Sequence, residues 1–192
     1  WGWFPSASAG WMVSNEDFFS DWNINWWDTF KLRASYGQTG NHGVGESAAY
    51  STLSSGSYGD ILSYVAGSFG NNGLGWEHTH STDIAADFAF LNNRIQVSLD
   101  WYTKTTTDLL YSVPVPAEAG ATNGSVTMNA ATMENTGLEF ALAWHDYGHE
   151  LKYDISANMT LPKNKVTSLG MGESQRIDGD CITKVGSEVG QF

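Results

Sequence analysis

The chain has little cysteine, few basic residues and no long apolar run, and each shortage excludes a class of protein. A single cysteine, Cys181, leaves no partner for an internal disulfide and excludes a cysteine-rich zinc site. Nine Lys and Arg stand against 21 Asp and Glu, and the formal net charge of -12 argues against a nucleic-acid partner, because phosphate binding needs a basic face. No run of about 18 apolar residues exists, so the sequence predicts no transmembrane helix.

Aromatic residues are abundant by contrast. They make up 14% of the chain and include nine Trp, while only 16% of the residues are charged. Two kinds of protein fit this composition. One is a soluble or surface-exposed Trp-rich β domain that binds polysaccharide, and the other is a membrane β-barrel with aromatic girdles at its two interfaces.

Apolar and polar residues alternate along several segments that are each about as long as one outer-membrane strand. The clearest are 84–90 and 95–102, which Asn92-Asn93 joins. Because side chains on a strand point to opposite faces with period two, each segment has one apolar and one polar face. Asn tolerates the positive φ of a tight hairpin. The apolar face would carry Ile84, Ala86, Phe88, Phe90, Ile95, Val97, Leu99 and Trp101.

Segments 29–37, 138–145 and 151–159 alternate in the same way. Strands of about 9–11 residues with an aromatic-rich outer face and a polar inner face are typical of a transmembrane β-barrel. We therefore predict an all-β chain that forms about six or seven antiparallel strands of such a barrel.

The connections between these segments alternate in length. The turns at 92–93 and 146–149 are short, whereas 40–75 and 113–132 are predicted to be long loops because they are rich in turn-forming residues. Outer-membrane barrels have short periplasmic turns and long extracellular loops. We therefore expect the two long loops to face the outside of the cell.

Two smaller elements are predicted near the ends of the chain. A short helix near 16–22, capped by Ser14 or Asn15, should lie with the short turns on the periplasmic side. One further strand is expected between Ile177 and Val189.

Six or seven strands cannot close a barrel around a transport lumen. An open sheet edge in lipid leaves unpaired backbone groups, each of which costs several kcal/mol, so such an edge is not viable. The chain also opens at Trp1 without a signal-peptide pattern. We therefore expect a piece of a longer secreted polypeptide, here called the parent protein, which supplies the remaining strands.

Several segments together resemble the SusC/RagA-like family of TonB-dependent outer-membrane transporters. In chain order they are Phe4-Pro-Ser-Ala-Ser-Ala-Gly-Trp11, Phe18-Phe19, Lys31-Leu-Arg-Ala-Ser-Tyr-Gly-Gln-Thr-Gly-Asn41, Leu74-Gly-Trp-Glu77, Asp87-Phe88, Phe90-Leu-Asn-Asn-Arg-Ile95, Thr106-Thr-Asp-Leu-Leu110, Met133-Glu-Asn-Thr-Gly-Leu-Glu-Phe140 and Val185-Gly-Ser-Glu-Val-Gly190. Each is weak alone, but their order and spacing cover nearly the whole chain.

The resemblance implies that residues 1–192 are a partial barrel domain from the C-terminal half of a 22-stranded barrel in the outer membrane of a Gram-negative bacterium. It implies a plug domain in the lumen and a TonB complex that acts through the N-terminal part, neither of which these residues contain. It also implies a SusD-like surface lipoprotein as partner. The cargo would be an oligosaccharide or a peptide.

No enzyme, cofactor or metal site is predicted. The carboxylates of Asp83, Asp87, Asp100, Glu139 and Asp154 lie on different strands, mostly in the polar register, which suits a solvated lumen wall better than a hydrolytic pair. His78 and His80 share a strand face near Glu77 and could hold a metal, but a polar strand extension in water is the favoured interpretation.

The candidate cargo-binding residues are aromatic side chains of the first long loop. They are Tyr50, Tyr58, Tyr64 and Phe69. Such rings would hang over the mouth of the lumen, where loops carry recognition. The alternative role for them is to pack the loop itself or to contact the lipoprotein, and the sequence favours that alternative.

Overall fold

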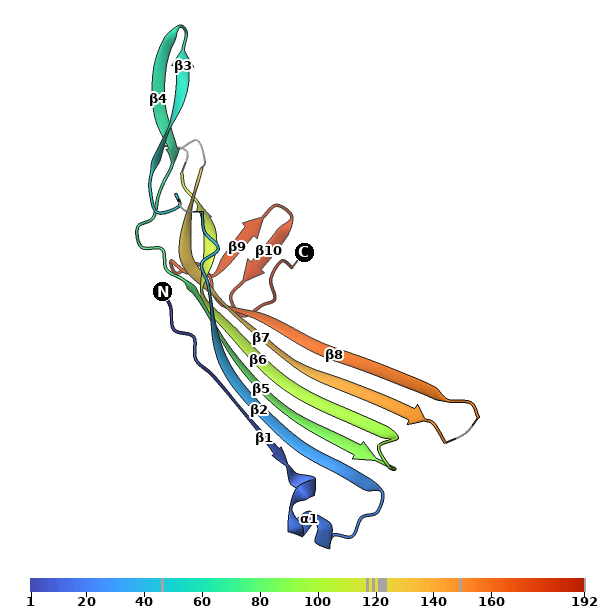
Figure 1. The fold of residues 1–192 in the computed structure, drawn as a ribbon. Coiled ribbons are helices and arrows are strands. Elements are labelled where there is room, and N and C mark those ends of the chain that lie inside the picture. Colours follow the sequence, from blue (N-terminus) through green and yellow to red (C-terminus); the bar gives the residue numbers. More distant parts are fainter. Residues whose placement is uncertain (46, 117, 119, 121–123, 149, 192) are drawn as a thin grey trace. The chain divides into compact units, whose positions relative to one another are not determined.

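The structure is a computed structural model that describes residues 1–45, 47–116, 118, 120, 124–148 and 150–191 (Figure 1). Strands dominate it, as predicted, and they form an antiparallel all-β chain. The strands are β1 (Ser6–Met12), β2 (Trp27–Asn41), β3 (Thr52–Tyr58), β4 (Ile61–Ser68), β5 (Glu77–Phe90), β6 (Ile95–Pro114), β7 (Ser125–Asp146), β8 (Tyr153–Ser168), β9 (Gln175–Asp178) and β10 (Cys181–Lys184). The helical elements are η1 (Val13–Asn15) and α1 (Asp17–Asp21).

Six strands form one sheet in the order β1-β2-β5-β6-β7-β8. Each strand therefore lies beside its predecessor in the chain, apart from the separate β3–β4 hairpin that is inserted after β2. The register of β1 against β2 places Trp11 opposite Leu32 and Gly10 opposite Arg33. Among the described residues, no helix combines the length and the apolar character that a membrane span requires.

The chain divides into two compact units, which are described separately here. The first, called the turn unit, comprises Trp1–Thr39, His80–Thr105 and Glu134–Asn164. The second, called the loop unit, comprises Gly40–Thr79, Thr106–Met133 and Lys165–Phe192.

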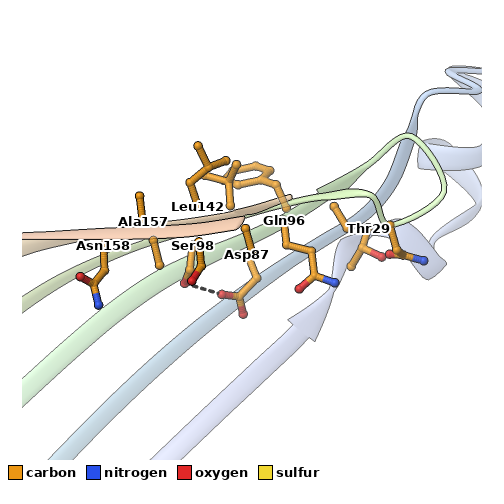
Figure 2. A pocket seen from close by; sticks show the side chains of 14 residues that line it. Thr29, Asp87, Gln96, Ser98, Leu142, Ala157 and Asn158 are labelled. Carbon is orange, nitrogen blue, oxygen red and sulfur yellow. Dashed lines mark hydrogen bonds between the residues drawn. The ribbon is translucent and has the colours of Figure 1, made fainter. Parts of the chain in front are cut away.

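The sheet of the turn unit has one apolar and one polar face. Figure 2 shows Leu142 and Ala157 on one side of the strands, and Asp87 and Ser98 on the other. A hollow on the apolar face is lined by side chains from five strands, among them Leu32, Ile84, Leu99, Phe140 and Met159. The predicted alternation is therefore confirmed.

The predicted short turns are present, and both belong to the turn unit. Residues 91–94 connect β5 to β6, and Leu91, Asn92 and Asn93 all have φ between 58° and 60°. Two Asn suit this left-handed backbone, whereas Leu91 adopts it without that advantage. The backbone N–H of Asn93 donates to the Asp28 carboxylate at 2.9 Å, which ties the turn to the start of β2.

The short helix is present, but its predicted cap is wrong. Glu16 occupies the N-cap position of α1, and neither Ser14 nor Asn15 caps it, because both belong to η1. Phe19 is only 8% exposed and its ring packs at 5.1 Å from the Trp27 ring. Packing of aromatic rings, rather than a side-chain cap, therefore holds this five-residue helix in place.

The predicted long loop at 40–75 contains the β3–β4 hairpin. Where one strand is predicted between Ile177 and Val189, the chain forms the β9–β10 hairpin, which begins at Gln175 and ends at Lys184. Both hairpins turn on a Gly-Asp pair, Gly59-Asp60 and Gly179-Asp180, whose glycines have φ of 63° and 59°. Glycine enters this backbone region without the clash that a Cβ causes. The sequence thus held a hairpin signal at both places.

The second predicted loop is shorter than expected. The sequence predicts a long loop over 113–132, whereas in the structure β6 continues to Pro114 and β7 begins at Ser125. A proline at the last position of a strand removes no bond from the interior of the ladder, so Pro114 marks the end of β6 rather than a break before it.

A glycine on the polar face of β7 makes room for an aromatic ring. A Cβ added at Gly137 would lie 2.6 Å from the ring and the hydroxyl oxygen of Tyr102. Only a residue without a side chain leaves space for this ring, so Tyr102 lies across the backbone of the neighbouring strand.

Replacing Gly137 by Ala is expected to destabilise the folded parent protein by about 1–3 kcal/mol, because Tyr102 must leave its position. Thermal unfolding of the purified parent protein measures the effect. Gly10→Ala is the matched control, since a Cβ there meets nothing closer than a Lys31 side-chain atom at 3.7 Å. The double variant with Tyr102→Ala should recover much of the loss, and an unchanged transition for Gly137→Ala alone would contradict the packing.

Candidate functional site

The polar face of the turn unit carries an ion cluster that joins three strands. Arg33 of β2 lies between Asp87 of β5 and Asp100 of β6. Its Nε donates to Asp87 Oδ2 at 2.7 Å, and its Nη2 donates to Asp87 Oδ1 at 3.1 Å and to Asp100 Oδ1 at 3.0 Å. The planar guanidinium group can serve both carboxylates at once because its donors form a fixed fork.

Ser98 completes this cluster. Its hydroxyl lies 2.7 Å from Asp87 Oδ1 and 2.9 Å from Asp100 Oδ2, and Figure 2 shows it beside Asp87. The side chains of Arg33, Asp87 and Asp100 are 36%, 32% and 21% exposed, so water screens the charges in part. The arrangement fits a wall that faces water, and it assigns Asp87 and Asp100 to structure rather than to a hydrolytic pair.

The cluster adjoins a shallow hollow on the same face. The hollow has a volume of about 780 Å³, and Figure 2 shows the polar groups of Thr29, Gln96 and Asn158 on this side of the sheet. Small residues such as Ala141 and Ala143 also line it. A wall of short and polar side chains leaves space for water or for another part of the protein.

In the loop unit, Glu77 joins three strands. Its Oε2 accepts from Asn41 Nδ2 of β2 at 2.7 Å, and its Oε1 accepts from the backbone N–H of Leu110 of β6 at 2.8 Å. The neighbouring Trp76 stacks on His42 with ring centroids 5.0 Å apart. These contacts bring together three of the segments that carry the family resemblance.

Asn129 of β7 forms hydrogen bonds that hold the segment preceding β5. Its Oδ1 accepts from the N–H of Gly75 at 2.7 Å, while its Nδ2 donates to the carbonyl oxygens of Gly75 at 3.0 Å and Asp108 at 2.8 Å. Asp108 has φ of 56°, a conformation that the extra hydrogen bond supports. No spacing in the sequence reveals this contact, because its partners lie 54 and 21 residues away.

The four candidate aromatics all lie in the loop unit, but they do not form one site. Tyr50, Tyr58 and Tyr64 are 69%, 84% and 66% exposed. Tyr58 faces Ile61 and Tyr64 faces Ser55 across the hairpin. Since residues directly opposite each other share a face and the face alternates along a strand, Tyr58 and Tyr64 point to opposite sides. Phe69 follows β4 directly and is partly buried.

A second polar group lies near the turn between β7 and β8. The Asp154 carboxylate pairs with His145 and accepts a hydrogen bond from Tyr147. That carboxylate raises the pKa of the Tyr147 phenol above its ordinary value. His80, by contrast, pairs with a phenol rather than with a carboxylate, since its Nδ1 lies 3.1 Å from the Tyr36 hydroxyl.

Comparison with known proteins gives the family. Residues 1–180 match the family model described as TonB dependent receptor-like, beta-barrel. The chain belongs to the TonB-dependent receptor β-barrel family. Its membership favours the membrane barrel over the soluble Trp-rich domain that the composition also allowed.

Individual relatives agree with this family. The TonB-dependent receptor P39 of Formosa agariphila is 34% identical over 171 residues, which are 88% of this chain and 16% of that protein. The TonB-dependent receptor SusC of Bacteroides thetaiotaomicron is 33% identical in an alignment of 202 positions that covers 98% of this chain and 19% of that protein. The predicted resemblance to the SusC/RagA-like family is confirmed.

The fold agrees as well. The structure of the RagAB peptide importer in its closed-closed state matches with a TM-score of 0.86 and 26% identity, over 97% of this chain and 20% of that one. The chain thus spans about a fifth or less of the length of these relatives.

The variant Arg33→Gln is expected to destabilise the parent protein by about 1–2 kcal/mol, because it leaves two aspartates on neighbouring strands without their cation. The loss stays moderate since water reaches all three side chains. Chemical denaturation monitored by Trp fluorescence measures it.

Lys31→Gln is the matched control for this prediction. Lys31 lies on the same strand and face, and it attracts Asp87 only at longer range. The variant Arg33→Gln combined with Asp87→Asn and Asp100→Asn should regain part of the stability. Equal losses for Lys31→Gln and Arg33→Gln would show that the cluster itself contributes nothing.

Proposed function

We propose that this chain forms part of the wall of an active transporter that imports nutrients across the outer membrane of a Gram-negative bacterium. The observation that carries the proposal is the division of the sheet into two faces. On the apolar face Leu99, Trp101 and Leu142 are 46%, 41% and 37% exposed, and the polar face carries a partly exposed ion cluster. Such a sheet suits hydrocarbon on one side and a water-filled lumen on the other.

In this proposal residues 1–192 are one partial barrel domain, and the plug and the remaining strands belong to other parts of the parent protein. The short turns at 91–94 and 147–152 face the periplasm. The longer connections from β2 to β5 and from β6 to β7 face outward. Their lengths support this orientation, because outer-membrane barrels place long loops outside.

The cargo is an oligosaccharide, or else a peptide. The relative SusC supports the first class, and the similar RagAB structure, whose title names a peptide importer, supports the second. A SusD-like lipoprotein covers the outer mouth, and the TonB complex supplies energy through the N-terminal part of the parent protein. The protein is a transporter rather than an enzyme.

Within the chain, the rings of Tyr50, Tyr58, Tyr64 and Phe69 remain the candidates for contact with cargo. Flat exposed rings can stack on sugar rings or on peptide side chains. Because Tyr58 and Tyr64 lie on opposite sides of their hairpin, they contact either two different parts of one cargo molecule or two different molecules.

Introducing a charge on the apolar face tests the membrane assignment. Leu99→Arg is expected to impair assembly of the parent protein, because a charge near the middle of the lipid face costs about 2–4 kcal/mol. Gln96→Arg on the polar face is the control, since Gln96 lines the hollow beside the ion cluster. Ser98 is a poorer control because its hydroxyl binds both aspartates of the cluster. The folded fraction in isolated outer membranes is the readout, and equal effects at Leu99 and Gln96 contradict the assigned faces.

Uptake by cells tests the import function. Cells are offered a panel of oligosaccharides and a panel of peptides, and uptake is measured as loss of each compound from the medium. Deleting the gene of the parent protein should stop uptake of its cargo. Inactivating TonB should have the same effect. Tyr58→Ala and Tyr64→Ala should each raise the KM for uptake without changing the amount of folded protein. If no member of either panel depends on the parent protein and on TonB, the importer proposal fails.

A further inference from the structure

A continuous row of aromatic rings runs from α1 onto the strands of the turn unit. Trp11 contacts Phe18 with centroids 6.4 Å apart, and Phe18 contacts Trp22 at 5.9 Å. Trp22 and Trp26 both contact Trp27, at 6.3 and 6.4 Å. Four of these rings are about half exposed, and we call them the aromatic rim: Trp11 at 49%, Phe18 at 44%, Trp22 at 51% and Trp26 at 56%.

The aromatic rim continues the apolar face of the sheet. Trp11 pairs with Leu32, so it lies on the face opposite to Arg33 and its ion cluster. Trp26 contacts Phe90 at 5.6 Å, and Phe90 alternates with Ala89 in the same register as Ile84. The rim therefore extends the face that touches lipid under the proposed function, at the end of the strands that carries the short turns.

The charged side chains in the part of the chain that carries the aromatic rim are all acidic. Residues 1–30 contain four acidic residues and no Lys or Arg. Two of these carboxylates already accept hydrogen bonds. Glu16 accepts from the Trp11 indole N–H at 2.8 Å, and Asp28 accepts from the Asn93 backbone N–H at 2.9 Å. Within the described residues, Asp17 and Asp21 have neither a hydrogen bond nor an ion pair from their side chains.

Helix geometry places these two free acids beside the exposed rings. Asp17 and Asp21 are four residues apart in α1, and Phe18 is four residues before Trp22, the C-cap residue, whose backbone is also helical. Residues four apart lie on the same side of a helix, so a pair of like charges runs alongside a pair of aromatic rings. Like charges at this spacing repel each other, and a bound cationic group would relieve that repulsion.

We propose that the aromatic rim binds phospholipids whose headgroup carries a free ammonium group, as in phosphatidylethanolamine, and that Asp17 and Asp21 receive that ammonium. Indole rings prefer the depth of lipid headgroups, and they attract cations through their faces. The two carboxylates favour an ammonium group and repel the headgroup of an anionic lipid. This inference rests on the proposed membrane location, and it adds a lipid preference to it.

Native mass spectrometry of the intact parent protein tests the proposal. The protein is released from detergent after equilibration with equal amounts of phosphatidylethanolamine and phosphatidylglycerol that carry the same acyl chains. We expect the protein to retain more phosphatidylethanolamine. The double variant Asp17→Asn with Asp21→Asn should lose this preference while it keeps the aromatic packing. Trp22→Ala and Trp26→Ala should each lower phosphatidylethanolamine retention roughly twofold to fivefold.

Two controls separate the rim from the rest of the surface. Trp101→Ala removes an exposed ring of the apolar face away from α1, and Asp60→Asn removes an acid at the tip of the β3–β4 hairpin. Both should keep the wild-type preference. Equal retention of the two lipids by the wild type, or an unchanged preference in the double Asp variant, overturns the proposal.

Two further measurements, uptake by cells and the state of the protein in buffer without amphiphile, distinguish failure of this proposal from failure of the proposed function. A folded barrel that shows TonB-dependent uptake but no headgroup preference refutes only the lipid site. A parent protein that stays monomeric in buffer without any amphiphile refutes the membrane location, and the lipid site with it.

Discussion

Backbone groups in hydrocarbon must find their hydrogen-bond partners within the protein, because no water is available there. A strand that crosses a membrane therefore needs a neighbour on each side. In this chain the neighbours are successive strands, and short turns such as 91–94 join them with the least unpaired backbone. Under the proposed function the same constraint applies to β1 and β8, which lie at the two ends of the sheet order, and we propose that other strands of the parent protein pair with them.

The cohesion of the sheet beyond its backbone lies mainly on the polar face. Under the proposed function the apolar face lies against lipid, and lipid chains are as apolar as Leu, so the side chains of that face gain little from contacting one another rather than lipid. On the polar face, Arg33 links three strands through Asp87 and Asp100, and Tyr102 lies across a fourth at Gly137. Water screens these charges in part, which makes the cluster a moderate and replaceable stabiliser rather than a dominant one.

Framework and recognition are carried by different residues. The segments that resemble the SusC/RagA-like family supply contacts that hold the backbone, such as the Glu77 bridge to Asn41 and Leu110. The candidate cargo aromatics lie outside these segments, on and around an exposed hairpin. This separation explains why the sequence reveals the transporter family readily and leaves its cargo open between oligosaccharide and peptide.

The sequence alone determined the long alternating strands of the main sheet, their two faces and the short turns, because alternation with period two and turn-forming residues such as Asn92-Asn93 are local properties. The Gly-Asp turns of the β3–β4 and β9–β10 hairpins are also local signals in the sequence, although neither hairpin is among the predicted elements. Only the tertiary structure decided that Arg33 meets two aspartates, that Asn129 holds Gly75 and Asp108, and that Tyr58 and Tyr64 face apart. The Arg33 and Asn129 contacts join residues 21 to 67 positions apart along the chain, and no local pattern of residues encodes them. The orientation of Tyr58 and Tyr64 depends instead on the register of the β3–β4 hairpin.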